Sequence, residues 1–172
     1  MYQIPEKLTA FTVYQNGSTF LGVADVTLPS FEYLSDTIRG AGIAGEIDSP
    51  SVGLFGPMSC GLNWRTLERN AALLLAPQSH SLDFRGSQQV QNKLAGIVTH
   101  VPVKVTVRGN PKKYELGKME QNATTDSANE FEVTYIKVVI GGETVIELDK
   151  LNFIFIVGSV DYLAQMRANL GL

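Results

Sequence analysis

Apolar and polar residues alternate along much of this chain, and that period of two places successive side chains on opposite faces of a β-strand. In the clearest run, valines at 101, 103, 105 and 107 alternate with Pro102, Lys104, Thr106 and Arg108. A second alternating run at 130–140 meets Gly141-Gly142, and strand-like residues follow at 143–148 and 153–157. Asn16-Gly17, between strand-forming residues at 12–20, is a further strong hairpin signal. The chain is therefore predicted to be mainly β.

The alternation also predicts two long strands that flank a glycine-rich loop. These strands span 26–38 and 51–64, and the loop between them has three glycines in six positions, at 40–45. A strand of twelve or more residues reaches about 40 Å, whereas typical strands have about five or six residues. Pro57 and its neighbouring glycines predict a bend in the second strand. Exposed edges of such length favour aggregation unless neighbours cover them.

Within 51–64 one parity is almost wholly apolar and predicts a buried face, formed by Leu54, Met58, Cys60, Leu62 and Trp64. A first helix is predicted at 67–76, where Pro77 ends it. The segment 109–129 is polar and is predicted to be an exposed, irregular excursion.

A final short helix is predicted to start near Asp161 and to end at Gly171, which suit its two caps. Leu163, Met166 and Leu170 form a narrow apolar stripe along it. So short a helix is marginal alone in water, so it is expected to pack on the sheet or on a neighbour. The fold expected is one domain, 1–172: mainly β with two short helices, as a β-sandwich or partly open barrel.

Composition limits the partners and the compartment. The net charge of -3 does not predict a general phosphate-binding surface. Cys60 is the single cysteine and excludes an intrachain disulfide, which favours a reducing compartment. The N-terminus lacks the pattern of a secretory signal, and no apolar run approaches the roughly 18 residues of a membrane span. We expect a soluble protein without a stable membrane anchor.

No residue pattern predicts catalysis, a metal or a cofactor. His80 and His100 have no carboxylate or cysteine at ligand spacing, and Cys60 lies on the apolar parity of a strand. The glycine loop lacks the spacing of a dinucleotide or phosphate loop. Glu143, Glu147 and Asp149 share one parity and are interpreted as charge that faces solvent or a lumen.

Five segments in order along nearly the whole chain resemble the major tail tube protein of contractile-tailed bacteriophages and the related tube of R-type bacteriocins. They are Ile4-Pro5, Leu28-Pro29, the loop Arg39-Gly40-Ala41-Gly42-Ile43, Phe84-Arg85-Gly86, and the ending Gly158-Ser159-Val160-Asp161 with Leu163-Ala164, Met166-Arg167 and Leu170-Gly171-Leu172. The stretch 109–129 does not match the core of that family.

The resemblance implies a structural subunit without enzymatic activity. Six subunits would form a ring whose strands join neighbours in a ring-shaped barrel, and rings would stack into a hollow tube inside a contractile sheath. The implied partners are other copies of the chain, the sheath protein, the tape-measure protein and DNA in the lumen, and the baseplate and tail-terminator proteins. The implied location is the virion tail, assembled in the bacterial host cytoplasm.

Three sets of site residues follow as expectations. The contact loop to the adjacent ring or subunit would be Arg39, Gly40, Ala41, Gly42, Ile43, Ala44 and Gly45. The C-terminal helix would pack through Leu163, Met166 and Leu170. The lumen-facing candidates are Glu32, Asp36, Ser59 and Asn63, because a neutral or acidic lining lets DNA slide.

Two alternatives stay open. The same architecture would serve the tube of a genome-free contractile injection system, such as an R-type bacteriocin or a secretion tube. A monomeric β-sandwich that binds a ligand would need a shared aromatic site, whereas Tyr33, Trp64 and Tyr135 fall on three separate predicted strands.

Overall fold

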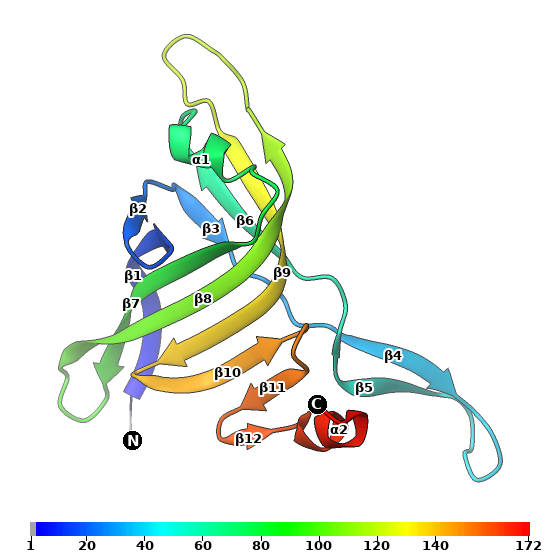
Figure 1. Cartoon of the computed structure of the whole chain (residues 1–172). Helices are drawn as coiled ribbons and strands as arrows, with labels where there is room; N and C mark the ends of the chain where they lie inside the picture. The colour runs from blue at the N-terminus through cyan, green and yellow to red at the C-terminus, as the bar shows by residue number, and fades with distance from the viewer. Residues whose placement is uncertain (1–2) are drawn as a thin grey trace.

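A computed structural model describes residues 3–172 and contains twelve strands and two short helices (Figure 1). The elements are β1 (Gln3–Gln15), β2 (Thr19–Leu21), β3 (Asp25–Thr27), β4 (Tyr33–Ile38), β5 (Ile47–Phe55), β6 (Ser59–Trp64), α1 (Arg69–Leu73), β7 (His80–Asn92), β8 (Val98–Glu115), β9 (Ser127–Ile140), β10 (Glu143–Asp149), β11 (Ile154–Val157), β12 (Val160–Asp161) and α2 (Ala164–Leu170). The mainly β class with two short helices is confirmed. Neither helix is long and apolar enough to cross a membrane within the described chain.

Ten strands form one antiparallel sheet that curls around the core (Figure 1). Its order is β12-β11-β10-β9-β8-β7-β1-β2, and β6 adds to β9 and carries β3. The inner face holds the largest buried side chains, among them Trp64, Phe131, Leu82, Ile136 and Leu148. These positions follow the period-two pattern, since Val105 and Val107 are buried whereas Lys104 and Arg108 are exposed.

Both predicted hairpins are confirmed, with a three-residue connection at 16–18 and a two-residue connection at 141–142. Asn16 and Gly17 have φ of 51° and 76°, and Gly141 and Gly142 have φ of 61° and 88°. Two consecutive positive φ angles define the turn whose twist matches antiparallel strands, which explains the preference for Asn and Gly.

The predicted strand 26–38 is wrong as one element, because it splits into β3 and β4. β3 pairs with β6 in the large sheet, whereas β4 pairs with β5 in a separate two-stranded sheet. Pro29, which has no backbone N–H, lies in the break between them.

The predicted strand 51–64 likewise splits into β5 and β6, and the bend expected at Pro57 is the point of division. Backbone groups in this bend find other partners: the Gly56 N–H donates to the Glu32 carbonyl, and the Met58 N–H donates to the Glu132 carboxylate at 3.0 Å. Leu54, assigned to the buried face, lies before the bend and is 37% exposed.

The strands that flank the glycine loop are therefore not the long strands of this protein. β4 and β5 have only 6 and 9 residues, whereas β1, β7, β8 and β9 have 13, 13, 18 and 14.

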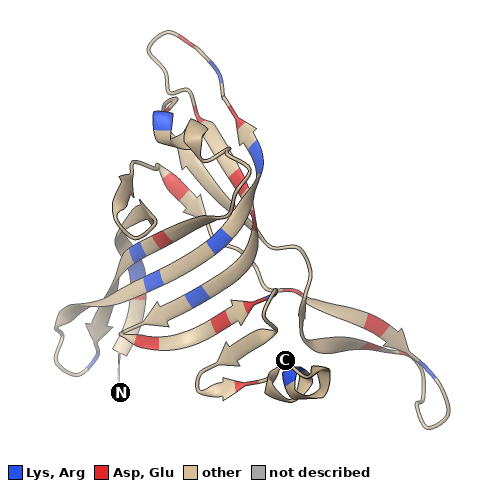
Figure 2. Cartoon of the chain, viewed as in Figure 1, with Lys and Arg blue, Asp and Glu red and all other residues tan. Residues whose placement is uncertain are grey.

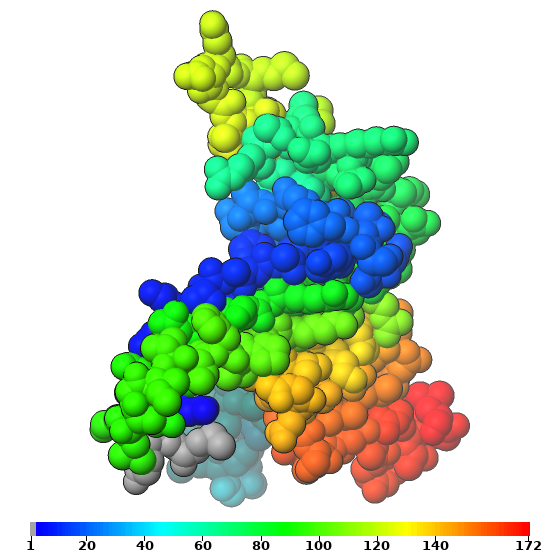
Figure 3. Space-filling model, turned by 90° about the vertical axis from the view of Figure 1, so that its left-hand side faces the viewer, coloured from blue at the N-terminus to red at the C-terminus, as the bar shows by residue number. Residues whose placement is uncertain are grey.

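About half of the predicted excursion at 109–129 is strand, which corrects the sequence interpretation. β8 runs on to Glu115 and β9 begins at Ser127, so that only 116–126 projects as a loop, at the top of the molecule in Figure 3. Register shifts beside Gly109 and Pro111 let the proline remain in the ladder. The polar side chains of 109–115 do not prevent strand formation, because the backbone of this segment forms hydrogen bonds with β9.

Both helices are shorter than predicted. α1 covers only Arg69–Leu73 of the expected 67–76. α2 begins after Leu163, because Val160 and Asp161 pair with β11 as β12. Asp161 still orders the start of the helix, since its Oδ1 accepts the Leu163 N–H at 3.0 Å. Gly171 has φ of 74° and forms the expected C-terminal cap.

Candidate assembly surfaces

The hairpin β4–β5 extends away from the rest of the molecule as an arm, which we define as residues 31–56 (Figure 1). Its tip is the glycine loop, where every residue of 39–45 except the half-buried Ile43 is exposed. Gly42 and Gly45 have φ of 93° and 122°, a region that L side chains rarely adopt. Arg39 and Glu46 form an exposed ion pair of 3.4 Å across the loop. The predicted contact loop is thus the tip of a projecting arm with no cover from the described chain.

Apolar side chains are exposed along the arm as well as at its tip. Ile38 and Ile47 face each other across the two strands and are 44% and 50% exposed, and Leu34 is 50% exposed. A two-stranded hairpin alone is marginally stable in water. This arm therefore needs stabilisation at its base and suits contact with another surface.

An aromatic cluster joins the base of the arm to the C-terminal segment. The rings of Tyr33 and Phe55 lie 4.6 Å apart, Phe55 lies 5.0 Å from Phe155 of β11, and Phe155 lies 5.9 Å from Tyr162. Such edge and tilted contacts stabilise aromatic pairs beyond their buried area. The cluster therefore holds the base of the arm against the C-terminal segment.

The C-terminal helix packs through only part of its predicted stripe. Leu163 is buried and Met166 packs against the core, whereas Leu170 is 57% exposed. Arg167 forms an ion pair with Asp161 and donates to the Phe153 carbonyl at 2.7 Å. The hydrogen bond from Arg167 lowers the pKa of Asp161 below its usual value. The helix is thus fastened to the sheet at its first turn and exposes its end.

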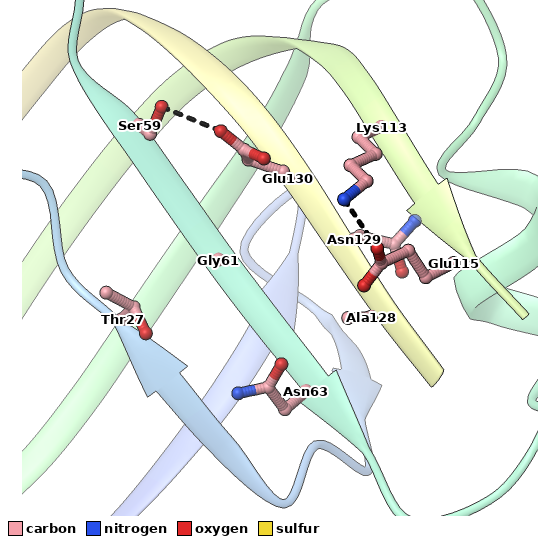
Figure 4. Close-up of a pocket in the computed structure, with 9 residues that line it drawn as sticks. All are labelled: Thr27, Ser59, Gly61, Asn63, Lys113, Glu115, Ala128, Asn129 and Glu130. Carbon is pink, nitrogen blue, oxygen red and sulfur yellow. Dashed lines mark hydrogen bonds and ion pairs between the residues drawn. The ribbon is translucent and has the colours of Figure 1, made fainter. Parts of the chain in front are cut away.

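The four lumen-facing candidates lie in two different places. Asp36 is exposed on β4 and Glu32 immediately precedes that strand, so both belong to the arm. Ser59 and Asn63 lie on the outer face of β6 in the large sheet, where they line a shallow depression (Figure 4). The Ser59 hydroxyl donates to Glu130 at 2.9 Å, and this bond lowers the pKa of Glu130.

A charged outer face of the large sheet was missed as a unit by the sequence interpretation. Lys and Arg lie on the three neighbouring strands β7, β8 and β9, and Asp and Glu lie on β7 and β10 at either side of them (Figure 2). We call it the charged face; its members are Asp83 and Arg85 of β7, Lys104 and Arg108 of β8, Lys137 of β9, and Glu147 and Asp149 of β10. The alternation around Lys104 and the shared parity of Glu147 and Asp149 were its sequence signals.

The curled sheet also remains open at its edges. Residues 3–12 of β1 pair with β7 on one side, and within residues 3–172 nothing pairs on the other side. An apolar groove lined by Leu8, Phe11, Val26 and Leu28 lies between β1 and the short strand β3. Open edges and exposed apolar side chains of this kind are normally covered in an assembly.

The residues considered for chemistry have structural surroundings. Cys60 is fully buried, and that burial raises the pKa of its thiol to about 12. Contrary to the expected loop or strand-edge setting, His80 is buried at the start of β7, where Nε2 lies 3.1 Å from the Ala76 carbonyl and Nδ1 lies 3.3 Å from Gln15 Nε2. Among residues 3–172 no three His, Cys, Asp or Glu side chains are grouped to hold a metal ion.

Comparisons with known proteins agree on one family. The chain is 31% identical over 179 aligned positions to the tail tube protein of Escherichia phage P2, covering 98% of this chain and 99% of that protein. It is 24% identical to the major tail tube protein of Serratia phage KSP20, covering 88% and 87%.

In structure it is similar, with a TM-score of 0.54 and 11% identity, to a chain of the sheath/tube terminator of an extracellular contractile injection system, PVC, in its extended state. That match covers 80% of this chain and 96% of the other and supports the fold alone. The family model for phage tail tube protein FII matches residues 5–171. The chain belongs to the phage tail tube protein FII family.

Proposed function

We propose that this chain is the structural subunit of a phage tail tube, built from the single domain 1–172, and that it has no enzymatic activity. Six copies form a ring, rings stack into a hollow tube inside a contractile sheath, and the tube conducts DNA into the host cell. The observation that carries the proposal is the projecting arm, together with the family membership. The arm of one subunit can contact a different surface, such as an open strand edge, of the next subunit. Contacts between two different surfaces of identical subunits are heterologous, and they close rings or extend filaments.

Each surface has a role in this assembly. The glycine loop at the tip of the arm, residues 39–45, contacts the adjacent ring or subunit. The open edge of β1 joins a neighbour, so that the sheets of six subunits close into a ring-shaped barrel without free edges. Leu170, exposed at the end of α2, packs against a neighbouring element. Sheath, tape-measure, baseplate and tail-terminator proteins complete the partners, and the location is the virion tail, assembled in the bacterial host cytoplasm.

Negative-stain electron microscopy of the purified protein tests the assembly. We expect rings or hollow tubes of uniform width. A variant that lacks Gly40 to Gly45 should stay soluble, as subunits or rings, but should not polymerise. Persistent monomers of the unmodified chain at high concentration, or normal tubes from the deletion variant, would contradict the proposal.

The lumen-facing role of Glu32, Asp36, Ser59 and Asn63 is a separate part of the proposal. Replacing Glu32 and Asp36 with Lys should leave assembly intact and slow DNA passage, because the added cations would hold phosphates. Infectivity and tube formation, measured on the same variant, separate these effects. A mapped tube in which both side chains lie outside the lumen would refute it.

A genome-free contractile injection system is the second candidate, because a chain of one such system has a similar fold and the same architecture would serve both devices. The subunit would be the same and the cargo would differ. Genes for capsid and terminase beside this one would favour a phage, and their absence would favour the genome-free device.

A further inference from the structure

The charged face is built by four neighbouring strands in register. Arg85 lies opposite Lys104, Asp83 lies opposite Thr106, and Thr106 lies in turn opposite Lys137. Lys137 lies opposite Glu147 of β10. Residues that pair across antiparallel strands point to the same side of a sheet. Four cations and three carboxylates therefore share one surface, opposite the buried core.

Each cation on this face lies beside a carboxylate. Asp83 is 3.7 Å from Arg85 and 3.6 Å from Lys104, and so serves two cations. Glu147 is 3.5 Å from Lys137, and Asp149 is 3.8 Å from Arg108. The two guanidinium groups also lie over aromatic rings, Arg85 over Tyr14 and Arg108 over Tyr135, at 4.3 Å and 4.1 Å.

The cations and the carboxylates differ in depth. The side chains of Arg85, Lys104 and Arg108 are 44%, 46% and 50% exposed, whereas those of Asp83 and Asp149 are 9% exposed. A molecule that passes over this surface meets the cations first. Without the carboxylates four cations would present a charge of +4, and with the three carboxylates the face carries +4 − 3 = +1.

Cations spaced along a surface bind nucleic acid by displacing the counterions of the phosphates. A face with exposed cations would retain a DNA strand, whereas a compensated face contacts it without holding it. The Asp83 carboxylate is held in position to neutralise the neighbouring cations, since its Oδ1 accepts a hydrogen bond from the Thr106 hydroxyl at 2.7 Å. Glu147 is fixed by Tyr135, whose hydroxyl donates to it at 3.0 Å.

We propose that the charged face is a contact surface for passing double-stranded DNA, and that Asp83 and Glu147 prevent its cations from retaining the phosphates. The inference rests on the proposed function, because a conduit for DNA is the setting in which such a surface is needed. It assigns the contact to β7–β10 of the large sheet, in addition to the candidates on the arm and on β6.

The test uses the full-length chain with Asp83→Asn and Glu147→Gln together, at a concentration that keeps subunits dispersed. Binding of a short DNA duplex is measured by fluorescence anisotropy at about 50 and 200 mM salt. The face then carries +3, and we expect affinity at least about tenfold above that of the unmodified chain, with a roughly 40-fold loss between the two salt concentrations, as for about three phosphate contacts.

A matched control makes the same change of net charge away from this face. Glu115 and Glu120 also form ion pairs with lysines, Lys113 and Lys118, and lie at or within the projecting loop. The variant Glu115→Gln with Glu120→Gln should bind the duplex no better than the unmodified chain. Circular dichroism checks folding, and Glu147→Gln alone, which frees only Lys137, is a second variant with a smaller expected gain.

Three results would overturn the inference: no gain in either face variant, an equal gain in the control, or unmodified protein that already binds as tightly. Because the assay uses dispersed subunits, it is independent of whether tubes form. Failure of the chain to polymerise would count against the tube proposal and leave the binding result to be judged separately.

Discussion

Asn129 connects the large sheet to the segment that carries α1, and its removal gives a quantitative test of the fold. Its side chain is 3% exposed and bridges two buried groups. Asn129 Oδ1 accepts the Trp64 Nε1–H at 2.8 Å, and Asn129 Nδ2 donates to the Ala71 carbonyl at 3.0 Å. Trp64 is 1% exposed and Ala71 is fully buried, so neither group can turn to water when the amide is lost.

We expect Asn129→Ala to lower the free energy of unfolding of the isolated subunit by about 4 kcal/mol. Each buried polar group left without a partner costs about 1–3 kcal/mol, and the substitution leaves two. For a chain of this size, about 4 kcal/mol corresponds to a fall in Tm of roughly 12 °C. Urea denaturation followed by Trp64 fluorescence, with calorimetry beside it, measures both quantities.

The control is Asn70→Ala, an exposed asparagine on α1, which should change the free energy of unfolding by less than about 0.5 kcal/mol. A double-mutant cycle with Trp64→Phe isolates one of the two hydrogen bonds, since phenylalanine has no N–H to leave unpaired. We expect a coupling free energy of about 1–3 kcal/mol. A loss below about 1 kcal/mol for Asn129→Ala, or strictly additive effects in the cycle, would refute the reasoning.

Three further predictions concern the base of the arm and the core. Gly53→Ala should destabilise the subunit by about 2–4 kcal/mol and expose the C-terminal segment to proteolysis, because a Cβ there would overlap Leu163 and φ is +72°; unchanged proteolysis would contradict this. Lys150→Met should cost about 1.5 kcal/mol in urea denaturation, since Lys150 Nζ donates to the Gly56 carbonyl at 2.8 Å in the bend after β5. Cys60 should resist thiol reagents at pH 8 until the protein unfolds, because burial raises its pKa to about 12 and keeps the thiol protonated. Its contribution to stability is complete below its ordinary pKa of 9.0 and is lost as pH rises toward about 12, so rapid labelling of folded protein would contradict the placement.

Local signals explain the features that sequence predicted well. The Asn16-Gly17 and Gly141-Gly142 turns depend on backbone φ at two adjacent residues, and the buried valines of β8 depend on a period of two. Cys60 was placed correctly by the same parity. The family, too, was recognisable from short segments in the right order along the chain.

Errors arose where local preference does not select a partner. Residues 26–38 all suit a strand, but β3 and β4 belong to different sheets, and the alternation in sequence carries no information on that division. The polar segment 109–115 is strand because β9 pairs with it. The lumen-facing role of Glu32, Asp36, Ser59 and Asn63 stays a prediction, and the structure adds that the first two lie on the arm and the last two on β6.

Periodicity, turn residues and similarity of sequence are enough to show that this protein is built of strands, which faces of those strands are apolar, where its tight turns lie, and to which family it belongs. The three-dimensional arrangement was needed to show that one hairpin leaves the sheet as an arm and that Asp83 compensates Arg85 and Lys104 across two strands. These two groups of features depend on interactions that act over different distances along the chain. Turn geometry and strand periodicity act between neighbours in the chain, whereas pairing of strands and of charges depends on which distant segments share the sheet.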